Sequence, residues 1–446
     1  MNRDYTIHDQ AASVFNEKAV GNKARVGPVS PPSRGRAPQW RPDIHVIHVP
    51  ESDIQDLRFL CDYPVAEIYE VKSGLAVGLV GDPAAEFLRL AEQLWRAIKP
   101  KGTVSKKRAI DLACDWLFKG DSSDSLTKYV LDAASAEAAL TKVWVPISGL
   151  DVQARFQVGS VTFEPLTAER IESWHKSDGY SKLDEDRRNA LGRYYADFSK
   201  EHRGHAIGWT ELVADKEQAK ILGLERIEDS LAMLRFFSGG AIVPSARSIC
   251  TPSGRERKEG YRVVLEREGR FAGESRGLLD AERARPWRVS RSEVADLMRS
   301  GLAKLSDLLN ANELSQFQER VLASARLFSD AALEHRLQVK LVLVLSALEG
   351  VYLGSRGEPI QQNIGERLAI MTESTPEARL AVTKLVRDVY DVRSNFVHHA
   401  ERVESSDAMA SFFRSAWHGV VRAIEHADRH TSVRDFTEAI DLEKFR

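Results

Sequence analysis

The sequence predicts an α+β protein in which a mixed α/β amino-terminal region precedes an all-α helical bundle. Helix-like and strand-like patterns alternate up to about residue 285, whereas from about residue 290 the apolar residues recur only at helical spacing. The chain has 446 residues, of which 43% are hydrophobic and 29% charged, so it has the composition of globular domains and room for two or three of them. The expected divisions are 1–43, 44–285 and 290–446.

The first 43 residues are expected to form a disordered basic tail. The stretch GNKARVGPVSPPSRGRAPQWRP combines Gly, Pro and Ser with basic residues and offers little apolar surface to bury. Such a tail could contact nucleic acid, but a solvated leader is the simpler interpretation. Its basic residues are Lys23, Arg25, Arg34, Arg36 and Arg41.

The region 44–285 is expected to mix helices with strands. IHVIHV, which begins at Ile44, predicts a short strand, and DPAAEFLRLAEQLWRAIK places apolar residues at helical spacing. KKRAIDLACDWLFKG predicts a second helix that Gly120 ends. The stretch 141–167 is rich in β-branched and aromatic residues and contains turn signals, so it predicts two or three strands. Residues 166–240 are expected to be helical.

A dense run of charge lies between residues 244 and 291. Within it YRVVLERE alternates like a strand, and acidic residues nearly match the basic ones in number. The run is therefore interpreted mainly as a solvated hairpin and linker. The alternative is an arginine-rich edge that faces RNA, because phosphate contacts favour such clusters.

The part of the chain after residue 290 is expected to be a helical bundle. Its four predicted segments are 290–311, 315–353, 376–399 and 406–428.

The third of these segments has a well-defined start and an apolar face. Thr375 can act as the N-cap, Pro376 suits the first helical position, and Glu377 favours the positive end of the helix dipole. The residues that recur at steps of three and four, and so face a core, are Val382, Leu385, Val386, Val389, Val392 and Phe396.

Near the end of this helix stand Arg393 and His398, with His399 directly behind. Arg393 lies beside the apolar face, where a partly desolvated guanidinium needs a carboxylate or a phosphate. His398 is five residues further on, which is a rotation of about 140° around an ideal helix. The pair could converge if Arg393 reaches along the helix, if the helix loosens at its end, or if a second copy packs across it.

An arginine and a histidine can together cleave RNA without a metal. An imidazole titrates near neutral pH, so it can exchange protons with the ribose 2′-OH or the leaving 5′-oxygen. A guanidinium can stabilise the charge that builds on the phosphate oxygens. The products would be a 2′,3′-cyclic phosphate and a 5′-hydroxyl.

The stretches SALEGVYLG, QNIGERLAIM and TKLVRDVYDVRSNFVHHA resemble the HEPN superfamily, and most closely its ApeA-like branch. In that branch an apolar helix with an Ala-Leu-Glu step precedes a helix that runs roughly Tyr-x-x-Arg-Ser-x-x-Val-His. The resemblance covers about 290–430, and WVPISGLDVQARFQVGSVTFEPLT is less specifically similar to the amino-terminal part of long ApeA-like proteins. The matching residues are Ala347, Leu348, Glu349, Tyr390, Arg393, Ser394, Val397 and His398.

The resemblance implies a small helical bundle that dimerises and brings two Arg-x(4–6)-His motifs into one cleft. Many such domains are metal-independent ribonucleases of toxin, anti-phage and other stress-response systems. Arg393 would then bind or orient the scissile phosphate, and His398 would be the acid/base group. Ser394 or Asn395 would fill the polar position after the arginine, and Glu349 would brace the arginine from the neighbouring helix.

Two residues of the motif have alternative interpretations. The branch usually follows its histidine with glycine, whereas this chain has His399, which also satisfies the looser family spacing. His398 is the favoured acid/base group, and His399 stays an alternative. Tyr390 could stack on a base or pack within the bundle, and packing is the simpler interpretation.

The expected partners are RNA, with tRNA as one candidate, and a second copy of the chain. No cofactor or metal is expected. The net charge of −2 provides no global attraction to nucleic acid or lipid. The start MNRDYTIHDQ lacks the apolar core of a secretory signal, and the run LVLVLSAL is shorter than the about 20 residues of a membrane span. A cytoplasmic protein is therefore expected.

The front half is expected to hold the nuclease idle until it senses an unknown trigger. One rival hypothesis makes the HEPN module catalytically silent, as an RNA-binding or dimerisation scaffold. A second makes the front half an enzyme or ligand receptor, with the helical end only pairing chains.

Overall fold

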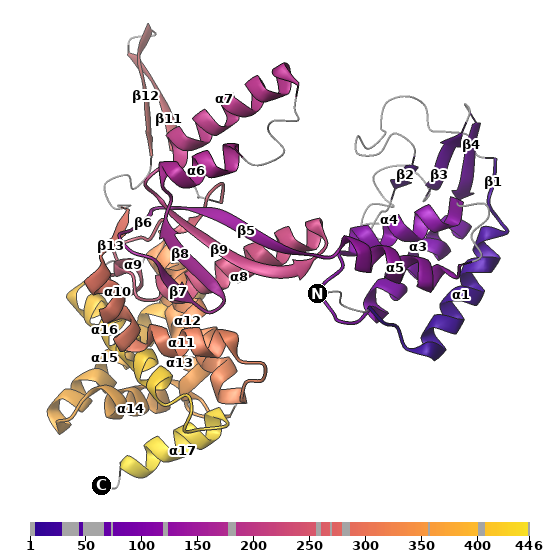
Figure 1. Ribbon diagram of the computed structural model, residues 1–446. Helices are drawn as coiled ribbons and strands as arrows, with labels where there is room; N and C mark the ends of the chain where they lie inside the picture. Colours follow the sequence, from indigo (N-terminus) through magenta and orange to yellow (C-terminus); the bar gives the residue numbers. More distant parts are fainter. Residues whose placement is uncertain are drawn as a thin grey trace. The chain divides into compact units, whose positions relative to one another are not determined.

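The structure is a computed structural model, and Figure 1 shows the order of its elements. Helices and antiparallel sheets occur in the same chain, which confirms the predicted α+β class. The chain divides into two compact units: unit 1 comprises Met1–Lys142 and Glu211–Leu222, and unit 2 comprises Val143–Thr210 and Gly223–Arg446. The described residues are 5–28, 44–47, 67–72, 75–118, 124–176, 184–255, 260–267, 270–278, 286–355, 357–399 and 406–444.

Unit 1 packs helices around a small core of its own. Phe87, Leu90 and Leu94 recur every three or four residues and are buried on one face of a helix, as the sequence pattern predicts. The predicted strand at Ile44 is confirmed as well. The helices are α1 (Asp9–Lys23), α3 (Asp82–Ala97), α4 (Lys106–Phe118) and α5 (Leu126–Glu137). The sheet has the order β1-β4-β3-β2, with β1 (Gly27–Pro28), β2 (Ile44–Ile47), β3 (Glu67–Lys72) and β4 (Leu75–Val80).

The prediction of a disordered tail over residues 1–43 is wrong for the amino-terminal helix α1. Phe15 and Ala19 of this helix pack against the core of unit 1. The side chain of Asn16 accepts a hydrogen bond from the Thr127 N–H and donates one to the Thr127 hydroxyl, each at 3.0 Å. One aromatic residue, one small residue and a polar contact thus hold α1 in place, and they produce no apolar stripe that the sequence would reveal. The predicted Gly- and Pro-rich stretch after Pro28 lies outside the described residues.

A second sheet, most of which belongs to unit 2, has the strand order β10-β5-β9-β8-β7. Its strands are β5 (Ala139–Ser148), β7 (Phe156–Val158), β8 (Val161–Pro165), β9 (Ala206–Ala214) and β10 (Thr251–Pro252). A short parallel pair, β6 (Leu150–Val152) and β13 (Trp287–Val289), and a hairpin, β11 (Gly260–Arg267) and β12 (Arg270–Leu278), complete the β-structure that is described. The predicted hairpin in the charged run is confirmed, and the question of an RNA-facing edge stays open.

The prediction that residues 166–240 are helical is only partly correct. Helices α6 (Ala168–His175), α7 (Glu185–His202) and α8 (Lys216–Arg235) form, but β9 lies between α7 and α8. β9 has a neighbour on each side in the sheet, and most of its residues are buried. A strand that is buried on both faces lacks the alternation of apolar and polar residues that distinguishes a strand from a helix in the sequence.

The carboxy-terminal part of unit 2 is a bundle of helices (Figure 1). The predicted segment 290–311 bends at Gly301, whose φ of 120° suits only glycine. The predicted segment 315–353 is two helices, because Glu334 ends the first and its carboxylate accepts hydrogen bonds from the N–H groups of His335 and Arg336. The helices are α9 (Gly239–Ile242), α10 (Arg291–Leu297), α11 (Ala303–Asn310), α12 (Gln316–Leu333), α13 (Leu337–Tyr352), α14 (Ile360–Thr372), α15 (Pro376–His399), α16 (Asp407–Glu425) and α17 (Val433–Glu443).

The expected domain boundary between residues 285 and 290 is wrong. Phe163 of β8 and Ile227 of α8 belong to the same hydrophobic core as Leu345 of α13 and Phe412 of α16. Most of the sheet and the bundle therefore form one compact unit. The chain divides near residue 142, and Glu211–Leu222 also belongs to unit 1. A truncation that removes residues 1–285 would expose the part of this core that packs against the sheet.

A close approach of α8 to β5 predicts the effect of a small substitution. A Cβ at Gly223 would lie 2.6 Å from Cβ of Val143, and neither atom can move without its backbone. Although alanine is a better helix former, Gly223→Ala is expected to destabilise the protein by about 1–3 kcal/mol. Urea unfolding measures the change. The matched control is Gly21→Ala in α1, where a Cβ would meet nothing within 4 Å, and a similar loss in both variants would contradict the packing argument.

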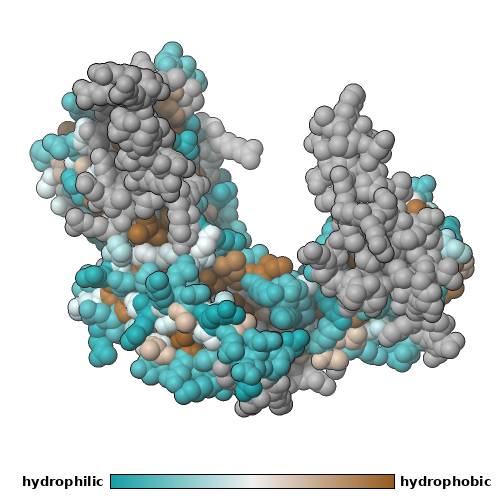
Figure 2. Space-filling model, turned by 90° about the horizontal axis from the view of Figure 1, so that it is seen from above, coloured by the Kyte–Doolittle hydropathy of each residue, from teal (hydrophilic) through white to brown (hydrophobic). Residues whose placement is uncertain are grey.

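Hydrophilic residues cover most of the described surface in the view of Figure 2, and hydrophobic residues are exposed there in limited areas. Within the described ranges, no helix combines the length and the apolar character needed to cross a membrane.

Candidate functional site

The helix that carries the candidate site, α15, forms as the sequence predicts. The Ala378 N–H donates to the Thr375 hydroxyl at 3.3 Å, so Thr375 caps the start of the helix. Val382, Val386 and Val389 are buried, and the helix packs against α13, α14 and α16. This anchoring defines which flank of α15 remains available to a ligand.

Tyr390 is buried in the bundle and is only 5% exposed. Its hydroxyl donates to Oε1 of Glu349 on α13 at 3.0 Å. Burial, and then the negative charge of Glu349, raise the pKa of Tyr390, whereas the positive charge of Arg393 acts in the opposite direction. The hydroxyl therefore stays protonated and donates throughout the physiological range. Packing is thus the role that the structure supports, and a buried ring is not available to stack on a base.

Arg393 follows Tyr390 by three residues and is half-buried on α15. Its charge influences the Tyr390 hydroxyl, so the guanidinium lies near the contact between Tyr390 and Glu349. The expected direct brace from Glu349 is not found, because no ion pair between Glu349 and Arg393 occurs in this described part of the bundle. Glu349 instead holds Tyr390, and Tyr390 stands beside Arg393 on the same flank of the helix.

His398 and His399 are both exposed at the end of α15, with ring centroids 6.5 Å apart. α15 stays helical through His399, so a loosened helix end is not the way in which the pair converges. On a regular helix His398 lies about 7.5 Å further along the axis than Arg393 and about 140° around it. The helix of one chain therefore places the guanidinium and the imidazole on different flanks. Ser394 is half-buried and Asn395 is exposed between them.

The contact between Tyr390 and Glu349 can be tested by removing one oxygen atom. Tyr390→Phe should destabilise the protein by about 1–2 kcal/mol, because the carboxylate of Glu349 loses its donor in a half-buried position. Denaturant unfolding measures the loss. Tyr194→Phe is the matched control, because Tyr194 is 58% exposed. Equal midpoints for the two variants would show that the hydrogen bond contributes nothing.

No group of three or more His, Cys, Asp and Glu side chains is arranged to hold a metal ion among the residues that the structure describes. Sequence reasoning missed one further group of polar residues, a groove between α1 and α3 in unit 1. The only sequence signal for it was a cluster of basic residues around Lys23 and Arg25, which was assigned to the tail.

Comparisons of the chain with protein-family models, with curated proteins and with solved structures found no match.

Proposed function

We propose that this protein is a metal-independent endoribonuclease of the HEPN type. The observation that carries the proposal is the end of α15, where a half-buried guanidinium at Arg393 and exposed imidazoles at His398 and His399 belong to one regular helix. The part-buried Tyr390–Glu349 hydrogen bond supports it, because this bond fixes the helix about one turn before Arg393. A positioned cation and a solvent-accessible base are the two groups that cleavage at a ribose 2′-OH requires.

In the proposed reaction, the 2′-oxygen attacks the adjacent phosphorus as an imidazole removes its proton. The bond between phosphorus and the 5′-oxygen breaks, and a protonated imidazole donates a proton to the leaving oxygen. Arg393 stabilises the additional negative charge on the phosphate oxygens. The products are a 2′,3′-cyclic phosphate and a 5′-hydroxyl, and DNA is not cleaved because it lacks the nucleophile.

We propose that a second copy of the chain completes the site. Arg393 and His398 lie on different flanks of α15, so the guanidinium of one copy and the imidazole of the other could meet across a pair of these helices. A homodimer would then be the active form. The matching of two identical surfaces is the usual arrangement in a twofold dimer.

The resemblance to HEPN domains supports a role in anti-phage defence or as a toxin in a prokaryotic cytoplasm, with RNA, and tRNA in particular, as the substrate. The part of the chain before the bundle would keep the nuclease inactive until a trigger arrives. Growth of a host cell that expresses the protein should then stop only once the trigger is present, and this arrest should depend on His398.

The test of the proposed activity is incubation of the purified protein with total RNA in excess EDTA. We expect fragments that end in a 2′,3′-cyclic phosphate and begin with a 5′-hydroxyl, as measured by end-group analysis. Cleavage that EDTA abolishes would exclude the metal-free mechanism. RNA binding without any cleavage, in a protein that still forms dimers, would favour the silent scaffold.

A further inference from the structure

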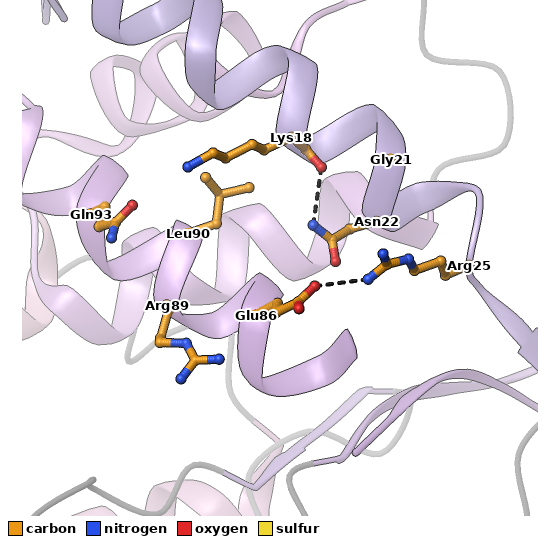
Figure 3. Close-up of a pocket in the computed structure, with 8 residues that line it drawn as sticks. All are labelled: Lys18, Gly21, Asn22, Arg25, Glu86, Arg89, Leu90 and Gln93. Atoms are coloured by element: carbon orange, nitrogen blue, oxygen red, sulfur yellow. Dashed lines mark hydrogen bonds and ion pairs between the residues drawn. The ribbon is translucent and has the colours of Figure 1, made fainter. Parts of the chain in front are cut away.

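Unit 1 contains a polar groove between α1 and α3 with a volume of about 430 Å³ (Figure 3). Each helix contributes residues at positions i, i+3, i+4 and i+7, which lie on one face of a helix. Because the two faces oppose each other, side chains distant in the sequence line one space. They are Lys18, Gly21 and Asn22 from α1, Arg25 two residues after its end, and Glu86, Arg89, Leu90 and Gln93 from α3.

The groove has an excess of positive charge. Lys18, Arg25 and Arg89 provide three cations against the single carboxylate of Glu86, a difference of two. Arg25 and Glu86 form an ion pair at 2.8 Å, but both side chains are about half exposed, so this pair is weak and easily rearranged. Lys18 and Arg25 are therefore cations without strong competing partners, and an anion that enters the groove would meet both of them.

The wall of the groove contains an unsatisfied acceptor. The Asn22 side chain is 8% exposed, and its Oδ1 has no hydrogen-bond partner within the described part of the chain. The orientation of the amide is fixed, because its Nδ2 donates to the Lys18 carbonyl at 3.0 Å and a reversed amide would place two oxygens together. Figure 3 shows Oδ1 on the side of the groove that faces Glu86 and Arg25. A buried acceptor of this kind costs free energy unless a donor reaches it.

Cations at the rim together with a buried acceptor define the chemistry of the ligand. We propose that this groove binds a phosphorylated small molecule whose uncharged part donates a hydrogen bond to Asn22, the class to which nucleoside monophosphates belong. The phosphate contacts Lys18 and Arg25, and an amino or hydroxyl group of the same molecule contacts Oδ1 of Asn22. The volume is in the range of small-molecule sites. This site is independent of the proposed ribonuclease activity.

Gly21 provides a means of closing the groove without disturbing the fold. A Cβ built at this position meets nothing within 4 Å, and the backbone there is helical. A larger side chain at Gly21 would therefore project into open space over the groove. Replacement by leucine should leave α1 intact, since leucine is a better helix former than glycine.

The experiment is isothermal titration calorimetry of the full chain with adenosine 5′-monophosphate, ribose 5-phosphate and inorganic phosphate. We expect one site per chain for adenosine monophosphate and at least tenfold weaker binding of inorganic phosphate. Comparable affinity for ribose 5-phosphate would identify the sugar as the donor to Asn22, and weak binding would identify the base. Lys18→Glu, Asn22→Asp and Gly21→Leu should each weaken binding at least tenfold.

Lys128→Glu is the matched control, because Lys128 lies in the same unit, outside the groove, and its replacement makes the same change of charge. It should change the affinity less than twofold. Circular dichroism of each variant shows whether unit 1 stays folded. The proposal is overturned if none of the three probes binds, if inorganic phosphate binds as tightly as the monophosphate, or if a folded Gly21→Leu variant retains full affinity.

Discussion

Replacement of His398 by alanine is expected to lower the rate of RNA cleavage by at least about a hundredfold, with no loss of stability. General acid–base catalysis contributes about 10²–10⁴-fold, and His398 supplies the proton transfer in the proposed reaction. The side chain is exposed at the end of α15, so its removal creates no cavity. Cleavage of an RNA with a fluorophore and quencher measures the rate, and the thermal midpoint measures stability.

His399→Ala is the matched control for this prediction. His399 is also exposed, and it occupies the next position of the same helix. If His398 is the acid/base group, His399→Ala should retain most of the activity. The reverse pattern would transfer the role to His399, and full activity in both single variants would remove the imidazole from the mechanism.

Mixing two inactive variants tests whether the site is shared between copies. In a site built from Arg393 of one chain and His398 of the other, a heterodimer of the Arg393→Ala and His398→Ala chains retains one intact pair. About a quarter of the wild-type activity should then return after subunits exchange, because half of the dimers are mixed and each contains half of its sites. A site within one chain would recover nothing.

The parts of the fold that depend on local sequence could be predicted, and those that depend on distant contacts could not. Thr375, Pro376 and the valines of α15 act within a few turns of one helix, so the bounds of that helix followed from its sequence. The boundary near residue 142 depends on Phe163 and Phe412 meeting in one core, which no local pattern shows.

The candidate site shows the same distinction. The exposure of His398 and the burial of Tyr390 follow from the position of each residue on an amphipathic helix. The hydrogen bond from Tyr390 to Glu349 could not be predicted, because the choice of partner for Glu349 depends on how α13 and α15 cross. The groove with Asn22 was missed because α1 and α3 are far apart in the sequence and Asn22 looked like part of a tail.

The largest effect on stability is expected for Arg367→Ala, because Arg367 is the centre of a buried ionic network. Arg367 is 5% exposed, and its guanidinium donates to the Tyr352 carbonyl at 2.7 Å and to both oxygens of Asp441 at 3.1 and 2.8 Å. It also contacts Glu358. These bonds join α14 to α17 and to the end of α13. Without the guanidinium, Asp441 keeps its ion pair with Lys444 at 2.9 Å, and Glu358 keeps the hydrogen bonds from Asn363 and the Ser355 N–H. Both partly desolvated carboxylates nevertheless lose the cation that joins them.

The expected loss from Arg367→Ala is about 3 kcal/mol in the free energy of unfolding, within the range for breaking one partner out of a buried pair. Arg434→Ala is the control, on α17, the helix that carries Asp441. Arg434 pairs with Glu438 at 2.7 Å, but the two side chains are 78% and 62% exposed, so its loss should be under about 0.5 kcal/mol. Equal urea midpoints for the two variants would show that the Arg367 network does not stabilise the bundle.

The same network determines how stability should depend on pH. Burial alone would raise the pKa of Asp441 and of Glu358. Hydrogen bonds from Arg367, helped by Lys444 at Asp441 and by Asn363 at Glu358, outweigh burial and lower both pKa values. A carboxylate with a lowered pKa in the folded state stabilises the protein above its unfolded pKa of about 4, and this contribution is lost as the pH falls through the folded value. Wild-type stability should therefore fall steeply below about pH 4. The Arg367→Ala variant should show a shallower fall, because the pKa values of its carboxylates lie closer to their unfolded values. Urea unfolding at pH 3 to 6 measures the dependence of stability on pH. Identical slopes for the two proteins would show that these carboxylates do not cause the acid sensitivity of the fold.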